Sequence, residues 1–530
     1  MRRWNGWGDD SVEFPLNPDA LKFLAEKIGQ GKPRNDISLP DACRQLPASR
    51  LPQHPKITID AEARIRASFG QSLQDWLKMR FGVIDRIVDG VAFPESSDEV
   101  RQLLDYAKAN NAIVLPYGGG TSVVGHLTPP AGPRPVLSLN LSRLNRLLHL
   151  DRSSQLATFG AGVAGPDLEA QLRAQGYTLG HFPQSFEYST LGGWVVTRSS
   201  GQQSLRYGRI EQMFAGGKLE TPNGSFDLPT FPASAAGPDL RELVMGSEGR
   251  MGVLTEAIVR VTPLPEYEKF HAVFFPNWDA AEAGVRAVAQ SKLPLSMMRL
   301  SNPVETLTTL KLAGHAKLIG LLESYLSLRG AGEGKCLMLF GLTGHLATCK
   351  QAKRSALQVL SKYGGVHVGT YMGDKWKHNR FRSVYLRNTL WQHGFVADTV
   401  ETACDWPKVK PMMMAMEQAA TDALAKFGVK VHTYTHLSHI YAQGSSVYTT
   451  FVWPMADDFQ TNLQRWQAMK HAVSEAIVHH GGTISHQHGV GKDHAPYLPA
   501  EKQPFGMQTL ATLFRQFDPD GVMNSGNLIE

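Results

Sequence analysis

Residues 116–122 read Pro116-Tyr117-Gly118-Gly119-Gly120-Thr121-Ser122 and are the strongest single indication of the fold. They follow Ala112–Leu115, a short apolar run with the composition of a buried strand. Consecutive glycines let the backbone approach a ligand closely and present several N–H groups to one oxyanion, while Thr121 and Ser122 add hydroxyls. The loop is therefore a candidate pyrophosphate cradle, with a plain turn as the alternative. It is neither a Rossmann fingerprint nor a Walker loop, because the third glycine of the first and the Gly-Lys-Ser/Thr of the second are missing.

Two more loops rich in glycine and hydroxyl groups follow in order. The first spans Pro183–Gly201 and contains Ser189-Thr190-Leu191-Gly192-Gly193-Trp194. The second spans Gly246–Leu254 and leads into an apolar run typical of a buried strand. Each loop alone is compatible with a turn, but three in succession predict one extended nucleotide cofactor.

The pattern of residues divides the chain into four parts. The first is polar and punctuated by proline, and we expect helices in it over 18–29 and 60–80. Thr262-Pro263-Leu264-Pro265 ends an alternation of strands, glycine turns and short helices. Beyond it we expect an antiparallel sheet with strands at 271–275 and 336–342 and helices at 280–290 and 347–363. The predicted parts are an N-terminal helical arm (1–85), a cofactor-binding domain (86–263), a cap domain with an antiparallel sheet flanked by helices (264–480), and a histidine-containing loop, a helix near 505–514 and a tail (481–530).

Composition and charge narrow the class of protein. The chain has 530 residues, is 42% hydrophobic and carries a net charge of +6, which excludes disorder and a multispanning membrane protein. It contains no block of Lys and Arg interleaved with aromatic residues, so we expect no nucleic-acid partner. The four cysteines are scattered and form no Cys-x-x-Cys pair, so we expect no disulfide framework and no metal site. Without a secretory signal or a peroxisomal C-terminal signal, we expect a cytoplasmic location.

These motifs, in this order, resemble a known family. Together with Trp4-Asn5-Gly6-Trp7-Gly8 and Ser485-His486-Gln487-His488-Gly489-Val490-Gly491-Lys492, the three glycine loops resemble the vanillyl-alcohol oxidase flavoprotein superfamily and, within it, the alkyl-dihydroxyacetonephosphate synthase family. The resemblance covers nearly the whole chain. It implies an α+β fold in which a two-subdomain FAD-binding domain of the vanillyl-alcohol oxidase (PCMH) type meets the cap domain, with the histidine loop returning to the flavin site.

The resemblance also implies non-covalent FAD. In covalent members of the superfamily a histidine in or near the first loop often carries the flavin, whereas that loop offers Thr121 and Ser122 here. His126 and Cys404 stay open as attachment points. The residues implied to hold FAD are Pro116, Tyr117, Gly118, Gly119, Gly120, Thr121, Ser122, Gln184, Ser185, Glu187, Ser189, Thr190, Thr197, Arg198, Ser199, Ser200, Glu248, Met251, Gly252, Val253 and Leu254.

By the same resemblance, the chain would exchange the acyl group of acyl-dihydroxyacetone phosphate for a long-chain fatty alcohol in ether lipid synthesis. The exchange would pass through a flavin N(5) adduct without net redox, and it needs a base, an acid for the ketone oxygen and a cation for the phosphate. His486 and His488 are the candidate bases, because imidazole titrates near neutrality. From spacing alone, a pair of structural loop histidines or a metal ligand pair is an alternative. The family has three consecutive histidines here, and Gln487 replaces the middle one.

Position in the family pattern implies roles for three more residues. Tyr448 would be the acid, although a tyrosine on a strand usually serves packing. Arg387 would bind the substrate phosphate, because a guanidinium matches an oxyanion. Arg299 would be a second arginine needed for activity, or a brace of the cap domain. All three assignments rest on the resemblance.

Several alternatives stay open. A FAD-linked 2-hydroxyacid dehydrogenase or oxidase of the D-lactate or glycolate type shares the fold, with a histidine taking the hydroxyl proton and the flavin the hydride. The methionines of 412–416 are flexible enough to line a tunnel for fatty chains, but a methionine-rich helix more commonly belongs to the core. We expect a homodimer, and peripheral contact with a membrane stays open because the family acts on lipids.

Overall fold

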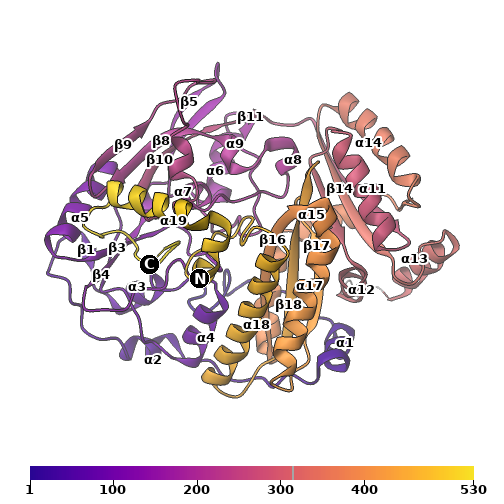
Figure 1. Ribbon diagram of the computed structural model, residues 1–530, viewed down its shortest axis with the longest axis horizontal. Coiled ribbons are helices and arrows are strands. Elements are labelled where there is room, and N and C mark those ends of the chain that lie inside the picture. The colour runs from indigo at the N-terminus through magenta and orange to yellow at the C-terminus, as the bar shows by residue number, and fades with distance from the viewer. Residues whose placement is uncertain (313–315, 530) are drawn as a thin grey trace.

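The computed structural model describes residues 1–312 and 316–529. Figure 1 shows two halves: the labelled strands β1, β3, β4, β5, β8, β9 and β10 lie in one, and β14, β16, β17 and β18 lie in the other. Strands β12 to β18 form one sheet. The yellow C-terminal segment, with helix α19 (Leu498–Phe517), lies against the first half although it follows the second in sequence. Mixed helices and antiparallel sheets in two halves confirm the α+β fold.

The first half begins with a four-stranded sheet in the order β1 (Ile57–Thr58), β2 (Gly90–Ala92), β4 (Val136–Asn140), β3 (Ile113–Tyr117). Strands β2, β4 and β3 are parallel, so a crossover must join β2 to β3. Helix α5 (Ser97–Ala109) makes it, and the Ser96 side chain caps the helix by accepting from the Glu99 amide at 3.2 Å. The crossover delivers the chain to the glycine loop at the carboxyl end of β3.

A second sheet completes this half. It is antiparallel, with the order β5 (Leu147–Asp151), β6 (Leu156–Gly160), β10 (Val253–Arg260), β8 (Phe214–Thr221), β9 (Gly224–Leu228). The second glycine loop leads into the short helix α7 (Leu191–Val196), capped by the Thr190 side chain, and the third loop leads into β10. All three loops therefore end on elements of this half.

The second half is built on a seven-stranded antiparallel sheet. Its order is β15 (Val366–His367), β12 (Tyr267–Phe275), β14 (Cys336–Gly344), β13 (Met297–Ser301), β17 (His432–Leu437), β18 (Gly444–Pro454), β16 (Phe395–Asp405). The predicted strands at 271–275 and 336–342 are parts of β12 and β14.

Helices cover both faces of this sheet because successive residues of its strands point to opposite sides. In β12, Phe270, Ala272 and Phe274 pack in a cluster with residues of α12 (Pro303–Leu312), α13 (Ala316–Leu328) and α15 (Tyr371–Asn379). Val273 and Phe275 pack in the main core with α11 (Trp278–Gln290) and α14 (Leu346–Ser361), which contain the helices predicted at 280–290 and 347–363 apart from a few end residues. The long helices α17 (Trp406–Ala425) and α18 (Phe459–His479) pack together beside β16 and β18.

The N-terminal arm differs from the prediction in one place. Helix α1 (Pro18–Ile28) is where expected, but the helix predicted over 60–80 is two helices, α3 (Ala61–Arg66) and α4 (Leu73–Phe81). At the break the Ser72 side chain caps α4 by accepting from the Asp75 amide at 3.1 Å, and the Gln71 amide donates to the Ser122 carbonyl at 2.6 Å, which draws this backbone onto the glycine loop.

The C-terminal segment contacts both halves. The Val114 amide of β3 donates to the Val522 carbonyl at 2.7 Å, so the tail extends the first sheet by a bridge.

The remaining elements are short: α2 (Leu39–Arg44), α6 (Gly165–Arg173), β7 (Tyr177–Thr178), α8 (Ser204–Tyr207), α9 (Ile210–Met213), α10 (Arg241–Val244), β11 (Thr262–Pro263) and α16 (Leu386–Gln392), with 3-10 turns at Leu141–Arg143, Arg382–Tyr385 and Ala495–Tyr497.

Candidate active site

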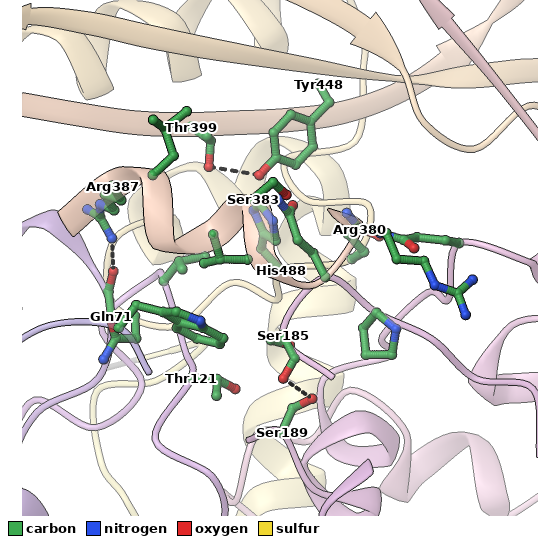
Figure 2. A pocket seen from close by; sticks show the side chains of 18 of the residues that line it. Gln71, Thr121, Ser185, Ser189, Arg380, Ser383, Arg387, Thr399, Tyr448 and His488 are labelled. Carbon is green, nitrogen blue, oxygen red and sulfur yellow. Dashed lines mark hydrogen bonds between the residues drawn. The ribbon is translucent and has the colours of Figure 1, made fainter. Parts of the chain in front are cut away.

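A cavity of about 990 Å³ lies where the two halves meet, at the upper end of the volumes usual for ligand sites. The glycine loops line one side, and strands β13, β16, β17 and β18 with the histidine loop line the other. Figure 2 shows Thr121, Ser185 and Ser189 facing Tyr448, Thr399 and His488 across this space.

The glycines at 118–120 are required by close approach between two loops. A side chain at Gly119 would overlap the Tyr188 carbonyl oxygen, and one at Gly118 would overlap the Thr190 hydroxyl. Gly120 also has a φ of +65°, which favours glycine. The two loops thereby form one continuous wall of backbone amides and hydroxyls, which fits a pyrophosphate-containing cofactor.

Most residues predicted to hold FAD line this cavity, and a few do not. Tyr117, Met251 and Val253 are buried in hydrophobic clusters, Arg198 pairs with Glu242 on the surface, and Glu187 also lies outside the lining. The predicted residues that line it are Pro116, Gly118, Gly119, Gly120, Thr121, Ser122, Gln184, Ser185, Ser189, Thr190, Thr197, Ser199, Ser200, Glu248, Gly252 and Leu254.

His126 and Cys404 are the two candidate points of covalent attachment. The His126 ring lies in the cavity lining, with Nδ1 2.6 Å from Ser122 Oγ and Nε2 2.9 Å from Glu248 Oε2. Cys404 lies on β16 outside the cavity lining, and burial raises the pKa of its thiol to about 11. Neither group is placed as a free nucleophile.

Tyr448 and His488 form the chemically distinctive part of the cavity wall. Their rings pack edge-on with centroids 5.5 Å apart, and the Tyr448 hydroxyl donates to Thr399 Oγ1 at 3.1 Å. Burial raises the pKa of Tyr448 to about 12. Burial lowers the pKa of His488, and the nearby Glu401 charge opposes that effect. At neutral pH the pair thus offers a protonated phenol beside a neutral imidazole.

His486 is separated from the cavity although it is only two residues away. Its Nε2 accepts from Arg209 Nη1 at 2.7 Å and contacts the Tyr441 hydroxyl at 2.7 Å, while Nδ1 lies 3.5 Å from Glu401 Oε2. Of the two predicted bases, the structure therefore places only His488 in the lining. Gln487, which replaces a family histidine, also lines the cavity.

Sequence reasoning missed Glu401, which holds the histidine loop. Its Oε1 accepts the backbone amides of His486 and Gln487 at 2.9 Å and of His488 at 3.0 Å, together with the Ser485 hydroxyl at 2.9 Å. Hydrogen bonds and both imidazoles keep the pKa of Glu401 well below its usual range against the opposing effect of burial. The sequence of this strand, which also contains Asp398, Thr399 and Thr402, gave no signal that singled out Glu401.

Arg387 lies at another part of the wall. Its Nε donates to the Ala397 carbonyl at 3.1 Å and its Nη1 to the Gln71 carbonyl at 2.6 Å, and the guanidinium stacks over Trp76 at 4.3 Å. Nη2 is buried and has no hydrogen-bond partner among the described residues. No carboxylate forms a salt bridge with this arginine within the described part of the chain, although the charges of Asp398 and Asp75 act on it from farther away. Nη2 is therefore the atom that can bind an anion.

Arg299 differs because its charge is already paired. Its Nη2 donates to Glu305 Oε1 at 2.7 Å and contacts His436 Nδ1 at 3.0 Å. The His436 ring in turn stacks on Tyr448, with centroids 4.8 Å apart and an angle of 20°. The contacts of Arg299 thus reach Tyr448 through one intervening ring.

One part of the cavity lining is a group of apolar residues that the sequence did not locate, called here the apolar branch. These residues come from the arm, α12, α13, α15 and strand β14, with Val368 just before α15. The methionines of 412–416 are not part of it: Met412, Met413 and Met416 are buried in the core, and Met414 is exposed. The branch residues include Phe14, Leu16, Leu310, Leu318, Ile319, Leu322, Leu337, Leu339, Val368, Met372 and Trp376.

Comparisons with known proteins agree with this architecture. Residues 88–226 match the FAD binding domain family, and residues 264–528 match the family described as FAD linked oxidases, C-terminal domain. The alkyldihydroxyacetonephosphate synthase of Dictyostelium discoideum is 30% identical over 98% of this chain and 85% of its own length. This chain belongs to the alkyldihydroxyacetonephosphate synthase family.

A solved alkyldihydroxyacetonephosphate synthase structure superposes on this chain with a TM-score of 0.84 and 25% identity, covering 99% of this chain and 98% of the other. The glycolate oxidase subunit GlcD of Bacillus subtilis is more distant, at 26% identity over 83% of this chain and 88% of its own length. As a member of the alkyldihydroxyacetonephosphate synthase family with an FAD binding domain, the chain takes FAD as its cofactor. The glycine loops at 118–122 and 184–200 lie within that domain.

Proposed function

We propose that this chain is an FAD-dependent alkyldihydroxyacetonephosphate synthase, which exchanges the acyl group of acyl-dihydroxyacetone phosphate for a fatty alcohol. The observation that supports this most is one cavity that combines the glycine loops, the Tyr448–His488 pair, the unpaired Arg387 and an apolar branch. Each part meets one requirement of the reaction. The glycine loops fit the cofactor, the Tyr448–His488 pair fits proton transfer, Arg387 fits the phosphate, and the apolar branch fits the fatty chain.

The side chains have distinct roles in this proposal. Arg387 binds the substrate phosphate, because an oxyanion satisfies its unpartnered Nη2. His488 takes a proton from the carbon between the ketone and the ester oxygen, and the fatty acid leaves as a carboxylate. Tyr448 donates a hydrogen bond to the ketone oxygen, where negative charge develops. The alcohol oxygen then takes the place of the carboxylate on that carbon, and His488 returns the carbon's proton. The hydroxyl proton of the alcohol leaves with the carboxylate, so nothing is oxidised or reduced overall.

FAD, held by the glycine loops, would supply a nucleophilic ring nitrogen, N(5), for the exchange. We propose that it is held without a covalent bond, since Ser122 and Glu248 lie against the two nitrogens of His126 and Cys404 lies outside the cavity. We also propose that the domains meet near residues 85, 263 and 480, as the sequence predicts.

The test is substrate choice by the purified flavoprotein. Anaerobic incubation with palmitoyl-dihydroxyacetone phosphate and hexadecanol should release palmitate and form the alkyl ether. D-lactate and glycolate should leave the flavin oxidised. Lasting bleaching by a hydroxy acid, with turnover by an artificial electron acceptor, would instead assign the chain to the oxidase activity named for the glycolate oxidase relative.

We also propose peripheral contact with a lipid surface through α13. Leu318, Leu321, Tyr325 and Leu328 follow helical spacing along this helix and are 42–87% exposed, and Leu318 also lines the cavity. No helix in residues 1–312 and 316–529 has the length and apolar character to cross a membrane. Leu321→Asp should reduce co-sedimentation with phosphatidylcholine vesicles.

We also propose that the protein is a homodimer, which sedimentation equilibrium would test.

A further inference from the structure

Glu401 concentrates four hydrogen bonds on one buried carboxylate oxygen. Three consecutive backbone amides and the Ser485 hydroxyl all donate to Oε1, and the residue is 3% exposed. Such a nest of amides is usual around a bound anion. Here the anion belongs to the protein itself, and the last of the three amides is that of His488.

The same strand fixes the loop at two further points. Thr402 Oγ1 donates to the Thr483 carbonyl at 2.6 Å, and the Thr483 amide donates to the Ala403 carbonyl at 3.1 Å. Residues 483–488 are therefore fastened along β16. Glu401 is also the residue of β16 that pairs directly with Tyr448 on β18. Glu401 thus pairs with Tyr448 in the sheet and binds the backbone of His488, so one residue fixes the position of both members of the pair.

The Glu401 charge lies close to both histidines of the loop. Oε1 is 3.9 Å from His488 Nδ1, and Oε2 is 3.5 Å from His486 Nδ1. Because Nδ1 of His488 faces the carboxylate, Nε2 is left as the atom that takes a proton. The titratable groups that face His488 are Glu401 and Asp398 from β16, Tyr448 from β18, Lys470 from α18, and His486 and His494 from its own segment.

We propose that Glu401 is a positioning residue for acyl–alkyl exchange, which holds the His488 backbone with its oxygen and stabilises the His488 imidazolium with its charge. This inference rests on the proposed function for its catalytic consequence. The proton balance closes on His488, which takes the proton that the substrate carbon loses and returns it once the alcohol has replaced the carboxylate, while Glu401 stays ionised throughout.

Glu401→Gln separates the two effects. The amide oxygen can still accept the backbone amides, but the charge is gone. Loss of a carboxylate at this range should lower the pKa of His488 by about one unit. The acid limb of the kcat/KM profile should move to lower pH accordingly, and the plateau should fall by about 100-fold, within the range of general-base contributions.

Glu169→Gln is the matched control. Glu169 is also buried and accepts from the Thr178 hydroxyl and the amides of Leu179 and Gly180 at 2.8–3.1 Å, but it lies outside the cavity lining. It should lose stability without any movement of the acid limb. Glu401→Asp, which keeps the charge, should restore the position of the limb even if its shorter chain lowers the rate.

The His488 titration is also followed directly by NMR of protein labelled with ¹⁵N-histidine, with the resonance assigned by His488→Asn. This measurement needs no turnover, so it tests the electrostatic part even if the wild type fails to exchange lipids, which would refute the proposed function alone. An unchanged His488 pKa in folded Glu401→Gln would overturn the inference. If Glu401→Gln does not fold, Glu401→Asp decides: a displaced acid limb in that variant would likewise overturn it.

Discussion

His488 packs edge-on against Tyr448 although the two residues come from the C-terminal loop and from strand β18. Burial moves their pKa values in opposite directions, lowering that of the imidazole and raising that of the phenol to about 12. Opposite shifts of neighbouring groups are how proteins assign a base and a hydrogen-bond donor at neutral pH. The pair therefore has the protonation states that proton abstraction beside a ketone requires.

Tyr448→Phe removes the hydroxyl and keeps the ring that packs on His436 and His488. We expect kcat to fall by about 100-fold, as when one donor to a developing oxyanion is removed. FAD content and the visible flavin spectrum should not change. Tyr106→Phe, which removes a hydroxyl bonded to the Pro52 carbonyl on the outside of α5, is the control. Full turnover by Tyr448→Phe would exclude the residue from the mechanism.

Arg387→Lys keeps a positive charge but loses the planar guanidinium group and its paired N–H donors. We expect the KM for acyl-dihydroxyacetone phosphate to rise about 10-fold or more, because hydrogen bonds to charged groups contribute about 1.5–3 kcal/mol. FAD retention should be unaffected. In contrast, Arg299→Lys should act mainly on kcat, since Arg299 reaches the site through His436 and Tyr448. Parallel loss of FAD and substrate binding in Arg387→Lys would show a folding defect in place of a phosphate contact.

Gly119→Ala tests the fit of the glycine wall. The added methyl would overlap the Tyr188 carbonyl, so the two loops must separate. We expect the purified variant to retain little FAD and to look pale. Gly320→Ala meets no atom within 4 Å and should bind FAD normally, with a slight gain in stability from its position in α13. A yellow Gly119→Ala protein with a wild-type FAD ratio would contradict the close approach.

Acid should destabilise the fold before the carboxylates titrate. Burial lowers the pKa of His432 to about 4 and that of His181 to about 3, against about 6.5 in an unfolded chain. Between these values the unfolded state binds protons that the native state does not, so stability is complete above pH 6.5 and falls as the pH drops through this window. Urea unfolding at pH 7.5 and pH 5 measures the slope.

His432→Gln should make this slope shallower, because it removes one of the buried neutral imidazoles. The side chain contacts only the Thr308 hydroxyl, at 3.0 Å, among the hydrogen bonds of the described residues. His149→Gln, at an exposed position, should leave the slope as it is. Equal slopes in wild type and His432→Gln would mean that His432 does not carry the predicted shift.

Short-range chemistry explains the features that could be predicted from the sequence. The Ser96 cap, the apolar strand before Gly118 and the strand and helix alternation around 271–290 depend on residues within a few positions of one another. The family motifs are also local strings, so they indicated FAD and the lipid substrates. The same reasoning placed one helix over 60–80, where the chain forms two helices and Gln71 contacts Ser122 at the break.

Tertiary structure alone decided which histidine faces the cavity and what holds it there. His486 and His488 are equivalent as sequence, yet only the fold brings Arg209 and Tyr441 to the first and Tyr448 to the second. Glu401 became recognisable only when the register of β16 and β18 set it opposite Tyr448 and under the loop. The physical reason is that local hydrogen bonds and backbone preferences are determined by neighbouring residues. Strand order and register depend instead on how apolar faces from distant parts of the chain are buried together.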